Sequence, residues 1–168
     1  MSEPPALHPE TIAEILDRHR VAYVLVGGFA ANLHGAVRPT QDMDVTPQTT
    51  VENLERLAAA LQELGAGIRV DELPEGIAFD TSAEALRGIK MLNLRSPHGD
   101  IDLTFEPAGF PHGYDDLISH AEPHMVGSIM IKVAAIGDVI LSKETAARAK
   151  DLVALPELYQ LAAQKDGR

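Results

Sequence analysis

The stretch that decides the fold is Val24-Leu-Val-Gly-Gly-Phe-Ala-Ala-Asn-Leu-His-Gly-Ala-Val-Arg-Pro-Thr-Gln-Asp-Met-Asp-Val45. Its first residues belong to a short apolar run, Tyr23 to Val26, which predicts a buried strand. Two glycines, Gly27 and Gly28, follow where this strand would lead into a short helix ending at His34. Glycine at such a turn lets the backbone approach a ligand closely, and N–H groups at the start of a helix suit a phosphate.

Two carboxylates lie at the other end of the stretch, on a strand predicted for Asp42 to Thr46. Alternate residues of a strand point to the same side, so Asp42 and Asp44 share one face while Met43 points into the core. Neighbouring carboxylates repel each other, and a cation between them relieves the repulsion. Mg²⁺ is usually bound by a few carboxylates together with substrate phosphates. The stretch therefore predicts a site for Mg²⁺ and a phosphate-bearing ligand.

Length and composition set the frame for this site. The 168 residues suit one domain, with a core at about 9–135 and a helical C-terminal part at about 136–165. The chain has no cysteine, which excludes disulfides and thiolate metal sites. It shows neither a signal peptide nor an apolar run of the roughly 18–20 residues that span a membrane. We therefore expect a cytoplasmic protein without a membrane partner.

The formal net charge of −11 also restricts the partners. A diffuse acidic surface argues against non-specific nucleic-acid binding. It leaves room for a small basic patch, a basic protein partner or an acidic metal site.

The rest of the chain alternates helical and strand patterns. Amphipathic helices are predicted for 9–20 and 50–64, and an antiparallel hairpin for 90–95 and 100–106 around the turn at 96–99. Weaker patterns predict strands near 68–70, 77–79, 122–126 and 128–133, helical turns at 82–86 and 114–120, one helix over 138–150 that continues or kinks into 151–155, and a last helix over 157–164 opened by Pro156. The fold class is α/β, a mixed sheet flanked by helices with a helical C-terminal tail.

A third carboxylate extends the predicted site. Asp102 lies on the strand predicted for 100–106, and Asp100 shares its face but lies nearer the hairpin turn, so it ranks second. If this strand lies beside that of Asp42 and Asp44, three carboxylates and a triphosphate can hold two metal ions. The alternative is a tight glycine turn without a ligand and a solvated edge strand.

Together these features resemble the nucleotidyltransferase superfamily, in which a Gly-Gly or Gly-Ser turn precedes Asp-x-Asp and a later strand supplies a third carboxylate. The closer resemblance is to its AbiEii branch, through Gly27-Gly28-Phe29-Ala30-Ala31-x-x-His34-Gly35-x-x-Arg38-x-Thr40-x-Asp42-Met43-Asp44. The stretch from Lys143 to Leu152, with Arg148-x-Lys150-Asp151, resembles the closing helix of that branch. The segment 66–88 carries no motif.

The resemblance implies an enzyme that uses Mg²⁺ and an NTP, transfers a nucleoside monophosphate to an acceptor and releases pyrophosphate. In that scheme Asp42 and Asp44 bind metal, and Asp102 binds a second metal or receives the proton of the acceptor. The NTP phosphates would be bound by five residues: Gly27, Gly28, Arg38, Thr40 and Lys143. The roles of Asp100, Arg148 and Asp151 stay open. An exposed, salt-bridged helix face explains Lys143 and Arg148 as well as a phosphate role does, and Lys150 and Asp151 fit surface or helix-capping positions.

The branch includes toxins of toxin–antitoxin pairs, which suggests RNA such as tRNA as the acceptor and a cognate antitoxin as a protein partner. A protein or a small molecule such as an aminoglycoside is an open alternative acceptor. A different class of function is a non-catalytic nucleotide- or metal-binding module, or an antitoxin-type interaction protein that keeps the fold.

Three histidines need a separate interpretation. His120 and His124 have the i, i+4 spacing of a zinc pair, but Pro123 lies between them and the His-Glu-x-x-His order is missing. We expect both in loops or at the surface. We expect His34 to be structural, packing beneath the loop that precedes Arg38.

Overall fold

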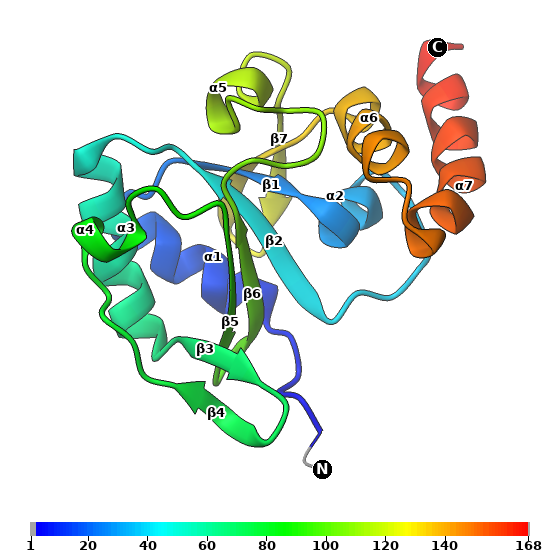
Figure 1. The fold of residues 1–168 in the computed structure, drawn as a ribbon. Coiled ribbons are helices and arrows are strands. Elements are labelled where there is room, and N and C mark those ends of the chain that lie inside the picture. Colours follow the sequence, from blue (N-terminus) through cyan, green and yellow to red (C-terminus); the bar gives the residue numbers. More distant parts are fainter. Residues whose placement is uncertain (1–2, 168) are drawn as a thin grey trace.

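The strand that carries Asp42 and Asp44 lies inside an eight-stranded mixed sheet (Figure 1). The computed structural model describes residues 3–167. The strands are β1 (Tyr23–Val26), β2 (Asp42–Pro47), β3 (Gly67–Val70), β4 (Leu73–Ile77), β5 (Met91–Ser96), β6 (Gly99–Thr104), β7 (Glu122–Val126) and β8 (Ile129–Val133), in the order β4-β3-β5-β6-β2-β1-β8-β7. The helices are α1 (Pro9–Arg18), α2 (Gly27–Leu33), α3 (Val51–Leu64), α4 (Ala83–Leu86), α5 (Tyr114–Leu117), α6 (Ile136–Ala146) and α7 (Ala149–Asp166).

The pairing of β2 and β6 positions the predicted carboxylates. The two strands are parallel, with Asp42 beside Asp100 and Asp44 beside Asp102. The predicted hairpin is confirmed as β5 and β6, which pair antiparallel from Met91 opposite Thr104 to Ser96 opposite Gly99. Two Asp-x-Asp segments from distant parts of the chain therefore lie side by side in register on one face of the sheet.

The opposite face of β2 belongs to the core, as the alternation predicts. Met43 is fully buried and joins one core with the apolar stripes of α1 and α3. The ends of α3 follow the sequence signals: the Thr50 side chain accepts a hydrogen bond from the Asn53 N–H, and Gly65 ends the helix with a left-handed backbone.

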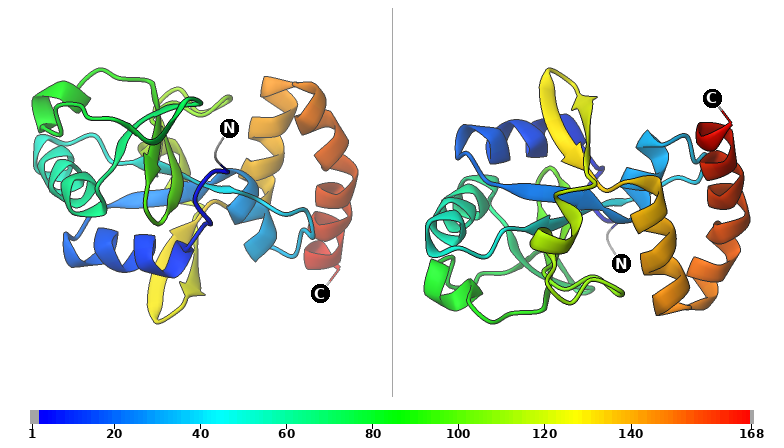
Figure 2. Two further views of the ribbon diagram at one scale, coloured as in Figure 1. Left: turned by 90° about the horizontal axis from the view of Figure 1, so that it is seen from below. Right: turned by 90° about the horizontal axis from the view of Figure 1, so that it is seen from above.

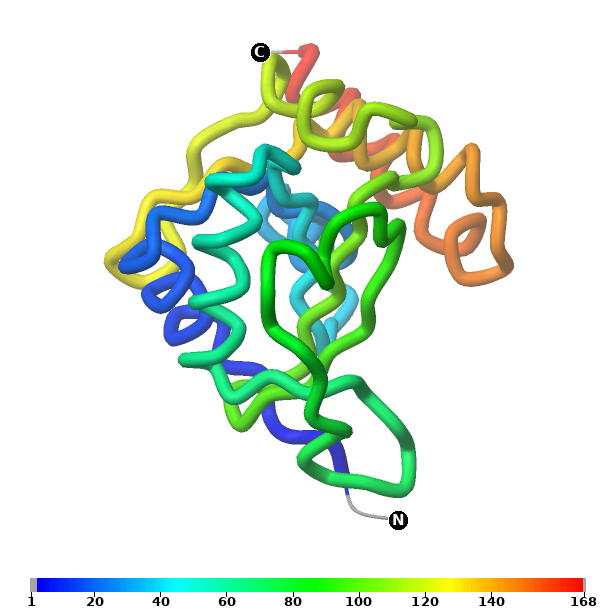
Figure 3. Tube along the Cα trace, turned by 60° about the vertical axis from the view of Figure 1, so that its left-hand side comes forward, coloured from blue at the N-terminus to red at the C-terminus, as the bar shows by residue number. Residues whose placement is uncertain are grey.

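The arrangement separates the two ends of the molecule. Figure 2 shows α1 and α3 at one end and the α6–α7 pair at the other, with the central strands between them. The hairpin of β3 and β4 projects away from α6 and α7 (Figure 3). No helix within residues 3–167 is long and apolar enough to cross a membrane.

Two details of the predicted elements are wrong. The second strand of the 66–88 segment is Leu73–Ile77 rather than 77–79. Its Pro74 is tolerated because β4 is the edge strand of the sheet, where a missing N–H faces solvent.

The C-terminal helices also divide at a different place. The break falls at Ala147, whose φ of 51° is left-handed, and Asp151 then accepts the backbone N–H of Arg148 to cap the start of α7. Pro156 lies inside α7 rather than opening a new helix. The carbonyl group that its missing N–H leaves unpaired belongs to Leu152, an exposed residue, so water can hydrate it.

Candidate metal and nucleotide site

Three carboxylates meet on the open face of the sheet. One oxygen from each of Asp42, Asp44 and Asp102 lies within 4.8 Å of the others. Asp42 and Asp44 project from β2, and the parallel neighbour β6 supplies Asp102. The structure thus places the predicted third carboxylate with the first two, at a spacing that one or two hard cations can bridge.

Burial and mutual repulsion act strongly on the β2 pair. Burial, followed by the negative charges of Asp42 and Asp102, raises the pKa of Asp44 to about 8. Burial and the charge of Asp102 raise the pKa of Asp42 as well. Within the described chain, no lysine or arginine forms an ion pair with either carboxylate. Such a pair is stabilised by a proton or by a bound cation.

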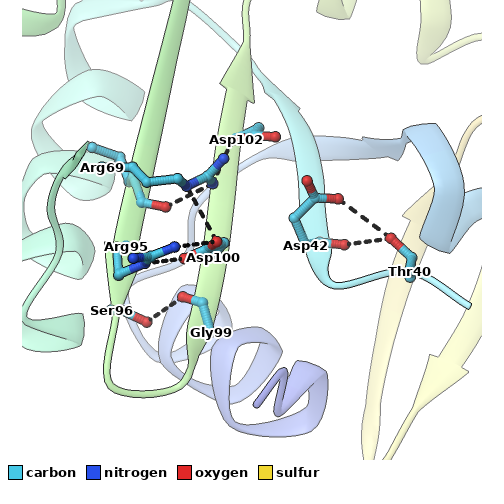
Figure 4. Close-up of polar contacts among 9 residues, drawn as sticks. Thr40, Asp42, Arg69, Arg95, Ser96, Gly99, Asp100 and Asp102 are labelled. Carbon is cyan, nitrogen blue, oxygen red and sulfur yellow. Dashed lines mark hydrogen bonds and ion pairs between the residues drawn. The ribbon is translucent and has the colours of Figure 1, made fainter. Parts of the chain in front are cut away.

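The β6 pair is balanced by arginines instead (Figure 4). Arg95 binds Asp100 through two hydrogen bonds, Nε to Oδ1 at 2.8 Å and Nη2 to Oδ2 at 3.1 Å. Arg69 reaches over from β3 and donates to Asp102 Oδ1 at 2.7 Å and to the Leu94 carbonyl at 2.9 Å. Its Nε also lies 3.2 Å from Asp100 Oδ2. Asp100, which the sequence analysis ranked behind Asp102 as a site residue, is therefore a buried ion-pair partner with a structural role.

Gly27 is required by the carboxylate itself. Its φ is +72°, and a Cβ at this position would lie 1.9 Å from Asp44 Oδ2. A Cβ on Gly28 would lie 3.2 Å from the Thr40 hydroxyl oxygen. The Thr40 hydroxyl in turn donates to the Asp42 backbone carbonyl at 3.1 Å. The Gly-Gly turn therefore lets the backbone at the start of α2 lie directly against the carboxylate cluster.

The cluster opens into a cleft of about 1000 Å³ between the sheet and the C-terminal helices. Five basic side chains line it: Arg38, Arg69, Lys143, Arg148 and Lys150.

Buried Asp151 organises two of these cations. It accepts a hydrogen bond from Arg148 Nε at 2.7 Å and lies 3.7 Å from Lys143 Nζ. Burial alone would raise the pKa of Asp151, but the hydrogen bonds from Arg148 outweigh it and lower that pKa. Asp151 therefore positions two neighbouring cations of the cleft. The residues predicted to bind phosphate all line this cleft: Gly27, Gly28, Arg38, Thr40 and Lys143.

Two site residues escaped the sequence analysis. Arg69 lies in the segment 66–88, where no pattern marked it. The pairing of Arg95 with Asp100 could have been predicted from the sequence, because the turn at 96–99 fixes the hairpin register and places the two residues opposite each other.

Neither the profiles of known protein families nor the sequences of curated proteins match the chain. Solved structures do. The crystal structure of the lincosamide antibiotic adenylyltransferase LnuA, bound to lincomycin, aligns over 94% of this chain and 99% of its own, with a TM-score of 0.59 and 15% identity. A proposed nucleotidyltransferase from Thermotoga maritima aligns over 98% of both chains, with a TM-score of 0.50 and 12% identity.

The chain has a nucleotidyltransferase-like fold. The predicted fold class is confirmed, including the C-terminal helices, because the likeness to LnuA extends over nearly the whole of both chains. At these identities the likeness shows the fold and leaves the substrates and the AbiEii branch to be tested. The acidic cluster of this nucleotidyltransferase-like fold fits Mg²⁺ by its donor set: three carboxylates, two of which form no ion pair with a basic side chain among residues 3–167.

Proposed function

We propose that the protein is a nucleotidyltransferase that transfers a nucleoside monophosphate from an NTP to an acceptor and releases pyrophosphate. The observation that carries the proposal is the meeting of Asp42, Asp44 and Asp102 beside the Gly27 turn. Phosphoryl transfer of this kind depends on positioning and on stabilisation of charge. A rigid cluster of three carboxylates, facing a cleft lined with cations, supports that chemistry.

The residues proposed to bind the metal and those proposed to bind the phosphates lie on two different walls of the cleft. Asp42, Asp44 and Asp102 would hold Mg²⁺, which when bound neutralises charge on the phosphates and on the attacking and leaving oxygens. The backbone at Gly27 and Gly28 forms the floor beside the cluster.

On the opposite wall, Lys143 and Arg38 would bind phosphate oxygens. Asp151 holds Lys143 in place through the contact at 3.7 Å. Asp102 would also accept the proton of the acceptor, as the resemblance suggests.

The acceptor is proposed on charge. The same cleft is lined by three acidic residues that take no part in the cluster or in positioning its cations: Glu106, Asp138 and Glu157. Together with the net charge of −11, these favour a cationic acceptor over a polyanion. LnuA acts on a lincosamide antibiotic, and a lincosamide or an aminoglycoside is the acceptor class we place first.

The AbiEii-like motif from Gly27 to Asp44 supports a second acceptor class, RNA such as tRNA, in a toxin with a cognate antitoxin. The cations Arg38, Arg148 and Lys150 supply the basic patch that such an acceptor would need. The two classes are separated by experiment.

The first experiment tests nucleotide use without knowledge of the acceptor. Thermal unfolding is followed with Mg²⁺ plus each NTP, for the wild type and for Asp42→Asn/Asp44→Asn. We expect a stabilisation that needs both Mg²⁺ and one NTP and that the variant lacks. A wild type that shows no such shift refutes nucleotide binding, and with it both the enzyme and the non-catalytic nucleotide module.

The second experiment identifies the acceptor. Transfer of label from the α-phosphate of the preferred NTP is measured with a lincosamide, an aminoglycoside, tRNA and the protein itself. Labelling of an antibiotic supports the small-molecule class, whereas labelling of tRNA supports the toxin. A protein that binds Mg²⁺ and NTP but labels none of these acceptors and releases no pyrophosphate is a non-catalytic module.

A further inference from the structure

A second cluster of metal-binding side chains lies apart from the carboxylate cluster. One ligand atom from each of His34, Glu122 and His124 lies within 4.8 Å of the others. His34 ends α2, while Glu122 and His124 project from β7. His124 lies on a strand rather than in a loop. Its side chain is about 26% exposed, and its ring packs edge-on against His34 at 5.4 Å.

The ring of His34 is fixed in the state that a metal ligand needs. Its Nε2 lies 2.7 Å from the Ala134 carbonyl oxygen, which can only accept, so Nε2 carries the hydrogen. Nδ1 therefore presents its lone pair to the cluster. Metal-binding histidines generally donate their other N–H in this way, which fixes the tautomer. His34 is 8% exposed, so its ring is held in place by its surroundings.

A cation already contacts two of these ligands. Lys165 Nζ, from the last turn of α7, lies 2.6 Å from His34 Nδ1 and 3.5 Å from Glu122 Oε2. Glu122 Oε2 lies 3.7 Å from His124 Nε2. The lysine ammonium is a stand-in ion: it contacts one imidazole and the carboxylate of the cluster, and the second imidazole lies beside the same carboxylate.

We propose that His34, His124 and Glu122 form a site for a divalent transition-metal ion such as Zn²⁺, in which the ion replaces the ammonium of Lys165. Two imidazole nitrogens and one carboxylate oxygen suit Zn²⁺, which takes such ligands with water in the fourth position. Imidazole selects against Mg²⁺, so this site and the carboxylate cluster prefer different ions. The bound ion joins β7 to the end of α2 and releases the last turn of α7.

The test begins from the Asp42→Asn/Asp44→Asn variant, which disables the carboxylate cluster as a competing site. Zn²⁺ affinity is measured against a coloured chelator, and the visible absorption of bound Co²⁺ reports the ligand type. We expect one equivalent of metal and a Co²⁺ spectrum typical of histidine ligation. No uptake, or a spectrum typical of oxygen ligands alone, would overturn the proposal.

Two further substitutions in that background test His124 as a ligand. His124→Gln should weaken Zn²⁺ binding by at least tenfold and remove the Co²⁺ bands. His120→Gln is the matched control, because this exposed histidine pairs with Asp138 outside the cluster, and it should change nothing. Equal Zn²⁺ affinity in His124→Gln and His120→Gln would overturn the assignment.

Lys165→Met separates a metal site from a purely structural lysine. Removing the ammonium that contacts two of the ligands should tighten Zn²⁺ binding several-fold. If the lysine only ties α7 to its neighbours, Lys165→Met lowers the melting temperature without any gain in Zn²⁺ affinity, and the claim that the ion takes its place fails.

Discussion

Two Asp-x-Asp segments lie side by side in this sheet, and they differ in what balances their charge. Asp42 and Asp44 on β2 and Asp100 and Asp102 on β6 pair residue by residue in parallel register. The β6 pair is bound by Arg69 and Arg95, whereas the β2 pair has raised pKa values and no basic partner in contact among the described residues. The same spacing on neighbouring strands thus forms arginine ion pairs on one strand and part of a candidate metal site on the other.

Asp102 belongs to both halves of this comparison. Its Oδ1 is 2.7 Å from Arg69 Nη2, and it also lies within the cluster with Asp42 and Asp44. The candidate metal site therefore lies at the boundary between the β6 pair, whose charge arginines balance (the compensated pair), and the β2 pair, which has no ion-pair partner among residues 3–167 (the uncompensated pair). Changes on each side of that boundary should affect different properties of the protein.

The largest effect is expected for the uncompensated pair. Asp42→Asn/Asp44→Asn should lower the rate of nucleotidyl transfer by roughly 10³-fold or more, because charge stabilisation supplies most of the rate enhancement in such reactions. Label transfer with the preferred NTP and acceptor measures it. Asp115→Asn, an exposed carboxylate on α5, is the control that should keep wild-type activity. Comparable rates in the two variants would remove the cluster from the mechanism.

The compensated pair should respond in stability. Arg95 and Asp100 have side chains only 8% and 10% exposed, so Arg95→Met leaves a buried carboxylate without its main partner. Breaking such a pair costs about 3–5 kcal/mol, measured by urea unfolding. The matched control is Arg18→Met, because Arg18 pairs with Glu63 at the surface with 59% of its side chain exposed, and such pairs contribute about 0–1 kcal/mol. Similar losses in both variants would contradict the assignment of Asp100 to a buried structural pair.

The boundary itself is tested at Arg69. Arg69→Met removes a guanidinium that neutralises Asp102 and competes there with a metal ion. We expect Mg²⁺ to bind several-fold more tightly, together with a modest loss of stability from the unpaired Asp100 contact. Calorimetric titration with Mg²⁺ measures the change, and Arg87→Met provides an exposed arginine as the control. Weaker Mg²⁺ binding in Arg69→Met would show that Arg69 positions Asp102 instead of competing for it.

The comparison also explains what the sequence could reveal. The spacing of Asp42 and Asp44 defines one face of a strand whatever the tertiary structure is, so their shared direction was predictable. Asp102 could be proposed as a third carboxylate, but whether β6 pairs with β2 depends on sheet order, which no local pattern encodes. The resemblance supplied that step.

The contacts of Arg69 and the histidine cluster could not be predicted from the sequence for a related reason. Arg69 comes from an edge hairpin with weak strand signals, and its partner Asp102 is 33 residues away in the chain. His34 and His124 are brought together only when β7 folds against the end of α2. Local rules also predicted wrongly that Pro156 begins a new helix. Pro156 lies inside α7, whose exposed side tolerates the loss of the backbone hydrogen bond that proline cannot donate.

The smallest effect is expected in the pH dependence of the metal-free protein. Asp44 has a folded-state pKa raised to about 8 from an ordinary value of 3.8, so the folded state binds this proton more tightly than the unfolded state does. The resulting stability is complete below about pH 4 and is lost as the pH rises towards 8.

In a chelator, the wild type should therefore lose a few degrees more in melting temperature between pH 5.5 and 8.5 than Asp44→Asn does. The variant corrects for titrating groups that both proteins share, including His34. Mg²⁺ should restore the loss in the wild type at pH 8.5, because it replaces the proton among the three carboxylates. Parallel pH profiles for the wild type and Asp44→Asn would mean that the arginines of the β6 pair also balance the β2 pair, and the contrast between the two strands would disappear.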